Sequence, residues 1–382
     1  MYDLIIIGGG PSGSAAGRSA GTAGLETLII EKEMFPRYKP CGGGLSEHAM
    51  SYLDFSIPQR LCEKNIFGAR IHFKGQVIER HKMYRVAISV TRSALDNYLL
   101  EKAMETGIEL RMGEKVIEYI EEPDFVEVRT NKEIYKSKFV IISEGSQGKF
   151  KQRVIGRRDR KDEYGICLVT EIEEDNSVID KYIYNSVDIH FGVANLGYGW
   201  IFPHKDYYSV GIGGTAKYMK NPKKIMVDFL NENGFKGDYE FKAHLIPTGG
   251  IKRNLVSSRV ILSGDAAGFV DSFSGEGIAY AIRSGQIAVK IIARVLFQNE
   301  SLSKLKDYGA MCQLDFGDNL KYSLMVAKVM HSYPNLFFKI FTSNDEVVDK
   351  YLDVMASKIT YKDYFYWLIP RIPKNIMLKK KN

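Results

Sequence analysis

The sequence predicts an α/β fold in which a parallel-sheet domain is split by an inserted β-sheet and followed by a helical C-terminal section. Three observations predict this arrangement. The chain opens with an apolar run, a glycine-rich turn and a helical pattern, and a second apolar run ends in glycine and aspartate at residues 264–265. Between these two motifs, residues 187–194 and 207–214 show the alternation of apolar and polar residues that is typical of β-strands.

The order of these motifs predicts three structural parts, of which the first two are discontinuous. Their expected bounds are 1–50, 90–160 and 250–300 for the split domain, 51–89 and 161–249 for the inserted mixed or antiparallel β-sheet domain, and 301–382 for the helical section. No internal repeat or low-complexity linker marks a sharper boundary.

Composition and charge exclude several classes of protein. With 45% hydrophobic residues, the chain is typical of a folded globular protein. No apolar run approaches the roughly 18 to 20 residues that cross a bilayer, and the opening MYDLIIIGGG lacks the basic region of a secretory signal. We therefore expect a cytoplasmic protein. The net charge of +7 forms no broad basic face with a binding motif, so we expect no nucleic-acid partner.

The cysteines and histidines indicate neither disulfides nor a metal. Cys41, Cys62, Cys167 and Cys312 are widely spaced, which favours free thiols in a reducing compartment over disulfides or an iron–sulfur cluster. The seven histidines show no HxH or HxxxH spacing. We therefore expect no metal ion.

The C-terminus combines aromatic and basic residues. YFYWLIP, at residues 364–370, precedes the cations Arg371, Lys374, Lys379, Lys380 and Lys381, with no acidic residue among them. This combination suits the surface of an anionic membrane, where it would hold the protein peripherally at the inner face of the cell membrane. A solvated, frayed tail explains the composition equally well.

The first motif, YDLIIIGGGPSGSAAGRSAGTAGLETLIIEKE, predicts a dinucleotide site. An apolar strand leads into GxGxxG, a helix begins near Pro11, and a second strand ends in an acid about 20 residues later. The helix N-terminus would bind the pyrophosphate, and the acid would accept hydrogen bonds from a ribose. The residues expected to bind the cofactor here are Gly8, Gly10, Pro11, Ser12, Gly13, Glu31, Lys32 and Arg37.

The second motif, VILSGDAAGFVDSFSGEGIAYAI, identifies the dinucleotide. It resembles the GD motif of FAD-dependent oxidoreductases related to p-hydroxybenzoate hydroxylase. The resemblance implies a split Rossmann-type domain that binds FAD, with Asp265 on the ribityl chain and the following helix start facing the flavin ring. It adds five cofactor-binding residues: Gly264, Asp265, Gly275, Gly277 and Ile278. A helix N-terminus there would stabilise negative charge on the reduced flavin.

Two further positions compare with the same superfamily. Arg92 begins a helical pattern with Leu95 and Leu99, and resembles the arginine that touches the cofactor; otherwise it is a surface residue. Glu144-Gly145 stands where relatives carry Asp-Gly after a strand. This departure weakens the expectation that a nicotinamide donor binds as it does in the hydroxylases.

Two motifs narrow the family. Tyr198, Trp200, Phe202 and Pro203, followed by the GxG of Gly211 and Gly213, match the YxWxFP…GxG motif of geranylgeranyl reductases. KPCGGGLS, at residues 39–46, resembles the cysteine–glycine loop of the same family. The likeness extends from the first glycine motif through the GD motif. It implies an oxidoreductase that hydrogenates C=C bonds in geranylgeranyl chains, as digeranylgeranylglycerophospholipid reductases do.

The aromatic motif has a structural and a functional interpretation. Tyr198, Trp200 and Phe202 alternate along a strand and therefore share one face, which could be ordinary sheet core. We favour a pocket wall, because a geranylgeranyl chain needs an apolar tunnel. The expected substrate-binding residues are Tyr198, Trp200, Phe202, Pro203, Gly211 and Gly213.

The cysteine–glycine loop is the expected catalytic element. Gly42, Gly43 and Gly44 would let the backbone pass against the flavin and leave room for substrate, while Cys41 projects beside the ring. An isolated alkene accepts hydride only if a proton reaches its other carbon. Cys41 could supply that proton, order a water or shape the pocket, and a small buried hydrophobe is the alternative interpretation.

The sequence thus predicts FAD-dependent reduction of prenyl chains of archaeal-type ether lipid precursors. A prenylated quinone or free geranylgeranyl diphosphate would be close substitutes. No second GxGxxG is present, so an external donor such as a ferredoxin or NAD(P)H would supply electrons. The alternatives are a flavin monooxygenase or halogenase, whose tryptophan-rich WxWxIP differs at Tyr198 and Phe202, and a non-catalytic prenyl-binding escort protein.

Overall fold

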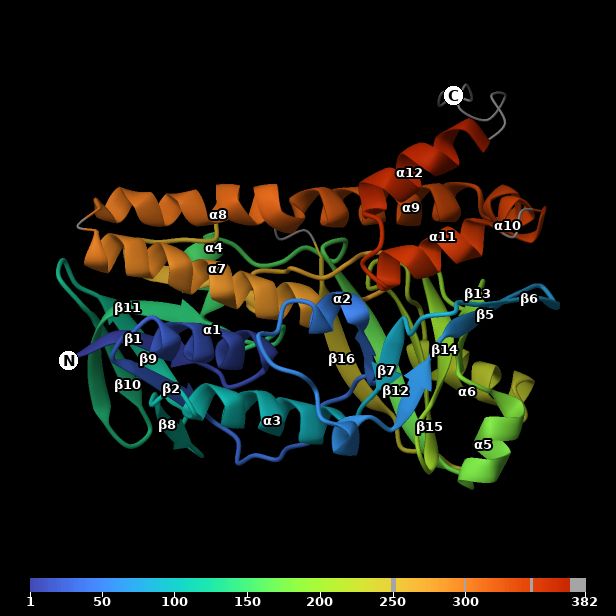
Figure 1. Cartoon of the computed structure of the whole chain (residues 1–382), viewed down its shortest axis with the longest axis horizontal. Helices are drawn as coiled ribbons and strands as arrows, with labels where there is room; N and C mark the ends of the chain where they lie inside the picture. Colours follow the sequence, from blue (N-terminus) through green and yellow to red (C-terminus); the bar gives the residue numbers. More distant parts are fainter. Residues whose placement is uncertain (249–251, 299, 344–345, 372–382) are drawn as a thin grey trace.

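The computed structural model describes residues 1–248, 252–298, 300–343 and 346–371. The cations Lys374 and Lys379–Lys381 of the expected membrane-binding tail therefore lie outside the described residues. Figure 1 shows an elongated molecule in which two large sheets lie side by side and the C-terminal helices lie along one side of both. No helix in the described ranges has the length and apolarity needed to cross a bilayer.

The first sheet is formed mainly by parallel strands and carries the N-terminus. Its strand order is β8-β2-β1-β11-β10-β9, and β17 pairs with β11. β8, β2, β1, β11 and β17 run parallel, whereas β9, β10 and β11 form an antiparallel meander. The strands are β1 (Tyr2–Ile7), β2 (Thr27–Glu31), β8 (Glu109–Met112), β9 (Val116–Glu121), β10 (Val126–Thr130), β11 (Ile134–Ile142) and β17 (Val260–Leu262).

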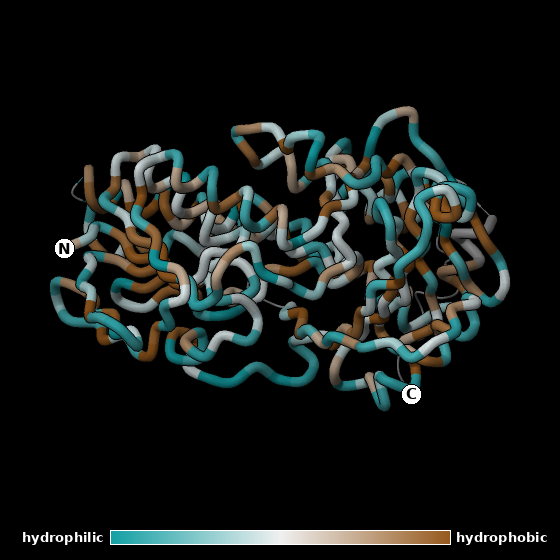
Figure 2. The backbone as a smooth tube through the Cα atoms, turned by 90° about the horizontal axis from the view of Figure 1, so that it is seen from below, coloured by the Kyte–Doolittle hydropathy of each residue, from teal (hydrophilic) through white to brown (hydrophobic). Residues whose placement is uncertain are grey.

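Three helices cover this sheet, and α1 lies between the other two. They are α1 (Pro11–Thr22), α3 (Arg92–Met104) and α7 (Ile278–Phe297). The contact of α1 with α7 depends on glycine, because a Cβ at position 285 would lie 2.4 Å from the backbone oxygen of Ser12. The apolar residues of β1, β2 and β11 are almost entirely buried, as expected for parallel strands covered on both faces. Figure 2 shows these hydrophobic strands gathered inside the N-terminal half of the molecule.

The second sheet is mixed, with strand order β16-β12-β15-β14-β13-β5-β6. Only the β5–β13 pair among these neighbours is parallel. The strands are β5 (Gly68–Phe73), β6 (Gln76–His81), β12 (Tyr164–Glu173), β13 (Ser186–Phe191), β14 (Gly197–Pro203), β15 (Tyr207–Thr215) and β16 (Lys242–Pro247). β13 is shorter than the expected strand 187–194, whereas β15 extends one residue beyond the expected 207–214.

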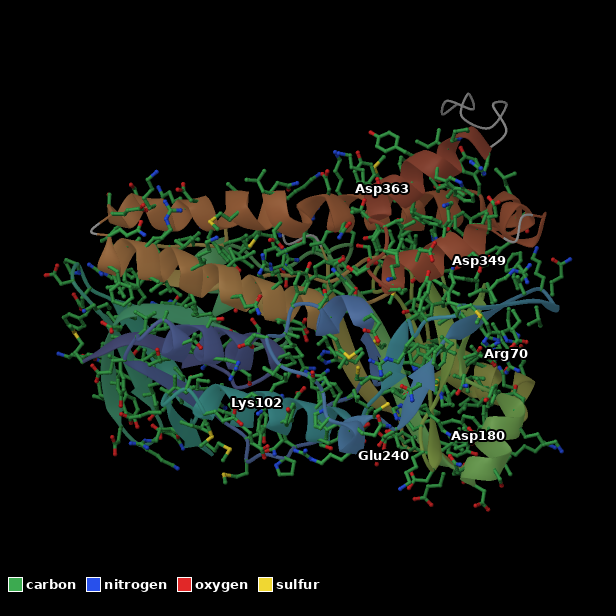
Figure 3. The ribbon with its side chains drawn as sticks, viewed as in Figure 1. Arg70, Lys102, Asp180, Glu240, Asp349 and Asp363 are labelled. Atoms are coloured by element: carbon green, nitrogen blue, oxygen red, sulfur yellow. The ribbon has the colours of Figure 1, made fainter. Side chains whose placement is uncertain are left out.

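The two faces of the second sheet have different neighbours. On the outer face, α5 (Asn176–Tyr182) and α6 (Pro222–Glu232) pack on residues such as Ile201 and Val210. The inner face carries Trp200 and Phe202 toward the rest of the protein. Charged side chains such as Glu240 and Asp180 lie on the periphery (Figure 3).

A small three-stranded sheet lies between the two large ones. β3 (Gly44–Ser46) pairs with β7 (Ala87–Ser89), which also pairs with β4 (Lys64–Ile66). β3 leads directly into the single turn of α2 (Glu47–Met50), whose N-cap is Ser46. A further short helix, α4 (Lys151–Ile155), follows the first sheet.

The C-terminal section is helical, as the sequence predicts. α8 (Asp307–Cys312) continues through a π turn at Gln313–Gly317 into α9 (Asp318–Ser332), followed by α10 (Pro334–Ser343), α11 (Glu346–Met355) and α12 (Tyr361–Leu368). Its buried side chains up to Leu320 pack in the core of the first sheet, whereas those from Tyr322 onward form one hydrophobic cluster with residues of the second sheet, among them Ile71 and Phe191. This packing places Tyr351, Leu352 and Met355 of α11 over the space between the sheets.

The packing of α1 on α7 predicts a stability difference between two helical glycines. Gly285→Ala places a methyl group against the Ser12 backbone, so we expect the free energy of unfolding to fall by about 1–3 kcal/mol through overpacking. Gly309→Ala in α8 is the control, because its Cβ would meet only Leu255 at 3.8 Å, and helix propensity should stabilise it by up to about 1 kcal/mol. Urea unfolding measures both, and equal effects of the two variants would contradict this account.

Candidate functional site

A single cavity of about 940 Å³ runs between the two large sheets. It begins at the glycine turn after β1, passes the loop 37–44 and the start of α7, and ends among apolar residues of β13, β14 and α11. Its volume lies at the upper end of the range for ligand sites. The carboxyl ends of the parallel strands form one end of it, where ligands bind in open α/β sheets.

The glycine turn brings backbone segments into contact where no side chain fits. A Cβ at Gly13 would lie 1.8 Å from the Gly8 oxygen, and Gly8 itself has φ +105°. Gly10 is the N-cap of α1 and provides no side-chain cap, while Pro11 occupies the first turn. Gly10, Pro11 and Ser12 line the cavity. The free N–H groups of this helix start therefore face the cavity and suit an anionic group.

Glu31 lies at the end of β2 and stabilises the turn. Its Oε2 accepts a hydrogen bond from Gly9 N at 2.7 Å, and its Oε1 accepts one from Glu33 N at 2.9 Å. Each carboxylate oxygen keeps a second lone pair, so Glu31 can still accept from a ribose hydroxyl at the cavity wall. Lys32 also lines the cavity, but its side chain is 63% exposed and pairs with Glu33.

Two expected cofactor residues, Arg37 and Arg92, are joined by a carboxylate that the sequence did not reveal. Asp96, fully buried, accepts two hydrogen bonds of 2.9 Å from Arg92 and lies 3.0 Å from Arg37. Burial alone would lower the pKa of Arg92, but Asp96 and the neighbouring Cys41 thiol raise it. Arg37 Nη1 is buried without a hydrogen-bond partner in the described part of the chain. Two cations share one anion, which leaves positive charge beside the turn at Gly10.

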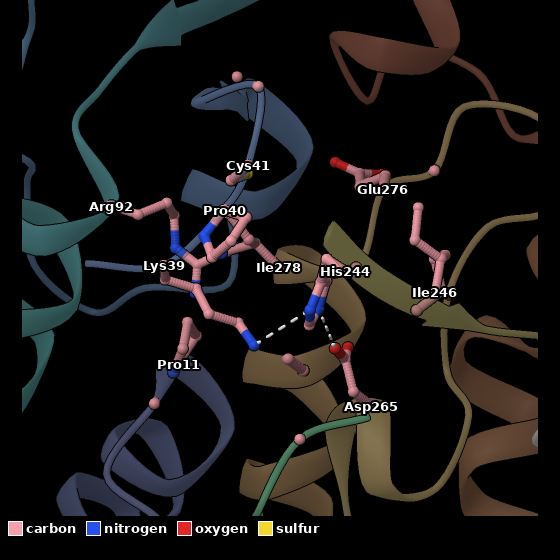
Figure 4. A pocket seen from close by; sticks show the side chains of 18 of the residues that line it. Pro11, Lys39, Pro40, Cys41, Arg92, His244, Ile246, Asp265, Glu276 and Ile278 are labelled. Atoms are coloured by element: carbon pink, nitrogen blue, oxygen red, sulfur yellow. Dashed lines mark hydrogen bonds and ion pairs between the residues drawn. The ribbon is translucent and has the colours of Figure 1, made fainter. Parts of the chain in front are cut away.

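Asp265 lies on the opposite wall of the cavity. It faces His244, which no sequence pattern indicated as a site residue. Its carboxylate lies 3.8 Å from His244 Nε2, and His244 Nδ1 lies 3.5 Å from Lys39 Nζ (Figure 4). Burial alone would raise the pKa of Asp265, but His244, Lys39 and Arg92 lower it. Burial lowers the pKa of Lys39. The Asp265 carboxylate is 26% exposed, so it can accept hydrogen bonds from hydroxyl groups of a ligand.

A second helix start without a side-chain cap faces the cavity at α7. Gly277 is its N-cap, and Gly275 adopts φ +76° just before it. Gly275, Gly277 and Ile278 line the cavity, whereas Gly264 (φ +58°) packs against Ser12. A Cβ at Gly277 would lie 3.4 Å from Asp265 Oδ1.

The residues along this wall fit FAD. The helix start at Gly10 and Nη1 of Arg37, which has no hydrogen-bond partner in the described ranges, suit a pyrophosphate, and Asp265 suits the ribityl hydroxyls. The N-terminus of α7 suits the part of the flavin ring that gains negative charge on reduction. All of them border the same cavity.

The three glycines after Cys41 pack against side chains of β14 and against His204, the residue that follows this strand. A Cβ at Gly42 would lie 3.1 Å from Trp200 Nε1, and one at Gly44 would lie 3.2 Å from Phe202. Gly43 has φ +76°, and its Cβ would lie 2.5 Å from the His204 ring. The triplet therefore has a packing reason that the sequence did not reveal, although Cys41, Gly42 and Gly44 also line the cavity. Their catalytic role stays a prediction.

His204 supports this loop from beneath. Its Nε2 donates to the Gly42 oxygen at 3.1 Å, and its Nδ1 faces the Glu63 carboxylate. Burial would raise the pKa of Glu63, but hydrogen bonds from His204 and Thr91 lower it. Both ring nitrogens of His204 thus face hydrogen-bond acceptors, and these contacts let the ring position Gly42 and Cys41.

The aromatic motif forms a wall of the cavity. Tyr198, Trp200 and Phe202 all project from the inner face of β14, and the Tyr198 hydroxyl donates to the Ser274 oxygen. Trp200 is 7% exposed, and its Nε1 has no partner in the described ranges.

The other expected substrate residues lie behind this wall. A Cβ at Gly211 would lie 2.2 Å from the Trp200 ring, and Gly213 lies beneath the same indole. Pro203 is buried at the end of β14. The structure gives the two glycines a packing role through Trp200 instead of a place on the cavity wall.

The fold also assembles a histidine cluster that the sequence spacing did not reveal. His72, Asp188 and His190 offer ligand atoms within 4.8 Å of one another on the outer face of the second sheet. However, Arg70 already donates two hydrogen bonds of 2.6 Å to Asp188, and the two imidazoles stack at 4.0 Å, so their in-plane lone pairs do not converge. The expectation of no metal stays a prediction.

The buried carboxylate of Asp96 generates a stability prediction. Asp96→Asn removes the anion between Arg37 and Arg92, so we expect unfolding free energy to fall by about 3–5 kcal/mol, as for other broken buried pairs. The matched control is Asp228→Asn, which breaks an exposed i,i+4 pair with Lys224 and should cost about 0.5 kcal/mol or less. Chemical denaturation of the two variants measures the difference, and a loss below about 1 kcal/mol at Asp96 would count against the buried cluster.

Comparisons with known proteins agree with this site. Residues 1–316 match the model of the FAD binding domain family. A digeranylgeranylglycerophospholipid reductase of Thermoplasma acidophilum is 26% identical over 388 residues, covering 94% of this chain and 92% of its own.

Two solved structures share the fold. A geranylgeranyl bacteriochlorophyll reductase-like protein of Thermoplasma acidophilum superposes with a TM-score of 0.82 at 23% identity, covering 98% of this chain and 97% of its own. A flavin-dependent brominase superposes with a TM-score of 0.74 at 20% identity, covering 97% and 98%. These two structures confirm the predicted α/β fold, and the family match over residues 1–316 confirms the FAD cofactor. The chain belongs to the FAD-binding domain family, and its homologues along nearly the full length include geranylgeranyl reductases.

Proposed function

We propose that this protein uses FAD to hydrogenate isoprenoid C=C bonds in geranylgeranyl chains, most directly those of archaeal-type ether lipid precursors. The proposal rests on one continuous cavity whose lining changes from polar and charged to apolar along its length. Its first part is bordered by the glycine turn, Arg37 and Asp265. Its second part is lined by apolar side chains from the small sheet, the second large sheet, the loop before α7 and α11, namely Ile66, Ile71, Val187, Ile189, Phe191, Val270, Phe273, Leu352 and Met355.

The apolar part suits a prenyl chain for a simple reason. Such a chain has no hydrogen-bonding group, and its binding is favoured by about 0.8 kcal/mol for each CH₂ removed from water. Tyr198 has its hydroxyl hydrogen-bonded to the Ser274 backbone, so its ring can border an apolar ligand without leaving a polar group unpaired. Trp200 and Phe202 extend the same surface toward Cys41.

The chain's own residues would place the alkene beside the flavin. Reduced FAD, when bound, supplies a hydride. The loop from Cys41 to Gly44, held by Trp200, Phe202 and His204, would set the distance between the flavin site and the prenyl chain. Closure of the cavity by α11 would exclude water from the reacting bond.

Partners and location belong to the same proposal. The sequence carries no second glycine fingerprint for NAD(P)H, and Glu144 accepts hydrogen bonds from the backbone of Phe150 and Lys151. We therefore favour a ferredoxin or another external donor, with NAD(P)H as an alternative. The C-terminal cations would hold the protein peripherally at an anionic membrane, where its lipid substrate lies.

The direct test is product analysis under strict anoxia. Purified holoprotein, reduced with dithionite, should add roughly two mass units per double bond to a digeranylgeranyl ether lipid, as mass spectrometry would show. Free geranylgeranyl diphosphate and a prenylated menaquinone are the parallel substrates. An oxygen-dependent gain of an oxygen or halogen atom would favour the monooxygenase or halogenase alternative, and a purified protein without flavin absorbance near about 370 and 450 nm would favour the escort.

The apolar part of the cavity predicts chain-length selectivity. Met355→Trp should fill space on α11 and exclude two or more CH₂ groups, so we expect kcat/KM for a 20-carbon chain to fall about tenfold, with a 10-carbon chain little affected. Met325→Trp is the control, because Met325 is partly exposed on α9. Equal losses for both chain lengths would place the prenyl chain elsewhere.

A further inference from the structure

Behind the start of α7, a chain of hydrogen-bonded side chains leads from the cavity to Tyr52, which is only partly buried. Tyr52 OH lies 3.1 Å from His48 Nε2, and His48 Nδ1 lies 3.0 Å from Glu276 Oε2. The hydroxyl of Ser46 donates to Glu276 Oε1. Ser46 and Glu276 line the cavity, whereas His48 and Tyr52 lie behind them.

The local structure fixes the orientation of the Glu276 carboxylate. Ser46 is the N-cap of α2, and its oxygen accepts from Ala49 N at 3.0 Å, so its own proton points to Glu276. The Glu276 backbone is tied down because its oxygen accepts from Asp271 N at 2.9 Å and its N–H donates to Ser274 Oγ at 3.1 Å. Figure 4 shows Glu276 across the cavity from Cys41.

The charges around His48 favour its protonated form. Burial alone would lower the pKa of His48, but the hydrogen bond and charge of Glu276, with Asp271 and Asp315, raise it. The Tyr280 ring lies against His48 at 5.6 Å, and Arg283, paired with Asp315, lies over Tyr52. A proton is thus stored next to a carboxylate that borders the cavity.

Other acidic groups near the cavity are placed less well for proton delivery. Cys41 Sγ accepts from Gly43 N and lies beside Arg92, and no hydrogen bond in the described part of the chain joins it to a group that titrates near neutrality. Burial raises the pKa of Asp271 to about 6, but this carboxylate is 1% exposed and accepts from Phe273 N and Ser274 N. Asp271 is not part of the cavity wall.

We propose that Glu276 is the catalytic acid that protonates the alkene, that His48 is the positioning residue that reloads it, and that Tyr52 connects His48 with solvent. This inference rests on the proposed function. His48 Nδ1 first gives its proton to the Glu276 carboxylate. Reduced FAD, when bound, would supply the hydride for one new C–H bond, and as the π bond breaks, its electron pair takes the proton from Glu276 to form the second C–H bond. His48 then regains a proton from water through Tyr52, which restores the starting carboxylate and imidazolium. The alkene is reduced by two electrons and the flavin is oxidised by two.

The activity test compares three variants under anoxia. Glu276→Gln should lower the rate of alkene saturation by about 10²–10⁴-fold, the usual contribution of a general acid. Reoxidation of its dithionite-reduced flavin by ferricyanide should stay within about threefold of wild type, because that reaction needs no protonated alkene. Cys41→Ser tests the competing proton donor and should lower the rate of saturation by a smaller factor than Glu276→Gln. Glu232→Gln, at the exposed end of α6, is the matched control and should behave as wild type.

Two further measurements distinguish a role of His48 and Glu276 in proton transfer from a purely structural role. Without cofactor or substrate, NMR titration should show the His48 pKa lower in Glu276→Gln by about one unit or more, because its anionic partner is lost. His48→Gln should shift the basic limb of the pH–rate profile, and Glu276→Asp should restore part of the activity lost in Glu276→Gln.

The outcomes distinguish this inference from the function on which it rests. If wild-type protein saturates the alkene but Glu276→Gln does so within about threefold, or if only Cys41→Ser loses activity, Glu276 is not the acid. An unchanged His48 pKa in Glu276→Gln would also overturn the relay. If wild-type protein saturates no prenyl substrate at all, the proposed function itself fails, whereas the His48 titration still tests the coupling.

Discussion

The architecture depends on the position of one indole ring between two stretches of backbone. Trp200 projects from β14 and is accommodated on one side by Gly211, where a Cβ would lie 2.2 Å from its ring, and on the other by Gly42. This contact joins the inserted sheet to the loop that follows the dinucleotide motif. Because protein interiors are close-packed, the separation of the two sheets cannot vary without a clash or a void at this point. The size of the cavity follows from it.

The cavity divides into a charged part and an apolar part for electrostatic reasons. Asp96 neutralises only one of the two guanidinium groups beside the α1 N-terminus, and the uncapped helix start adds to the remaining positive potential. A buried charge without a partner is costly, so such a site is stable only where an anion binds or water reaches it. At the other end, the side chains from β13 and α11 are apolar and favour a ligand without charge. One ligand class is expected at each end, and they meet near Cys41.

Two histidines support the loops that border the cavity where its charged part meets its apolar part. His204, paired with Glu63, holds the Gly42 oxygen, and His48, paired with Glu276, lies behind the start of α7. Each imidazole is buried and contacts a carboxylate at hydrogen-bond distance, which fixes the orientation of its ring. The loop with Cys41 and the loop with Glu276 thus reach the cavity as positioned elements.

The sequence alone determined the features that depend on the spacing of residues close together in the chain. The turn at Gly8–Gly13, the acid at Glu31 and the alternation of Tyr198, Trp200 and Phe202 each require a particular backbone conformation, so they predicted a strand, a helix start and a shared face that the structure contains. Only the tertiary structure decided which distant residues became partners. The contact of Asp96 with Arg37, that of His244 with Asp265, and that of His48 with Glu276, 228 residues apart, depend on how the sheets and helices pack. Periodicity along a chain describes which face a residue occupies, but it contains no information on what the opposite face of a cavity will present.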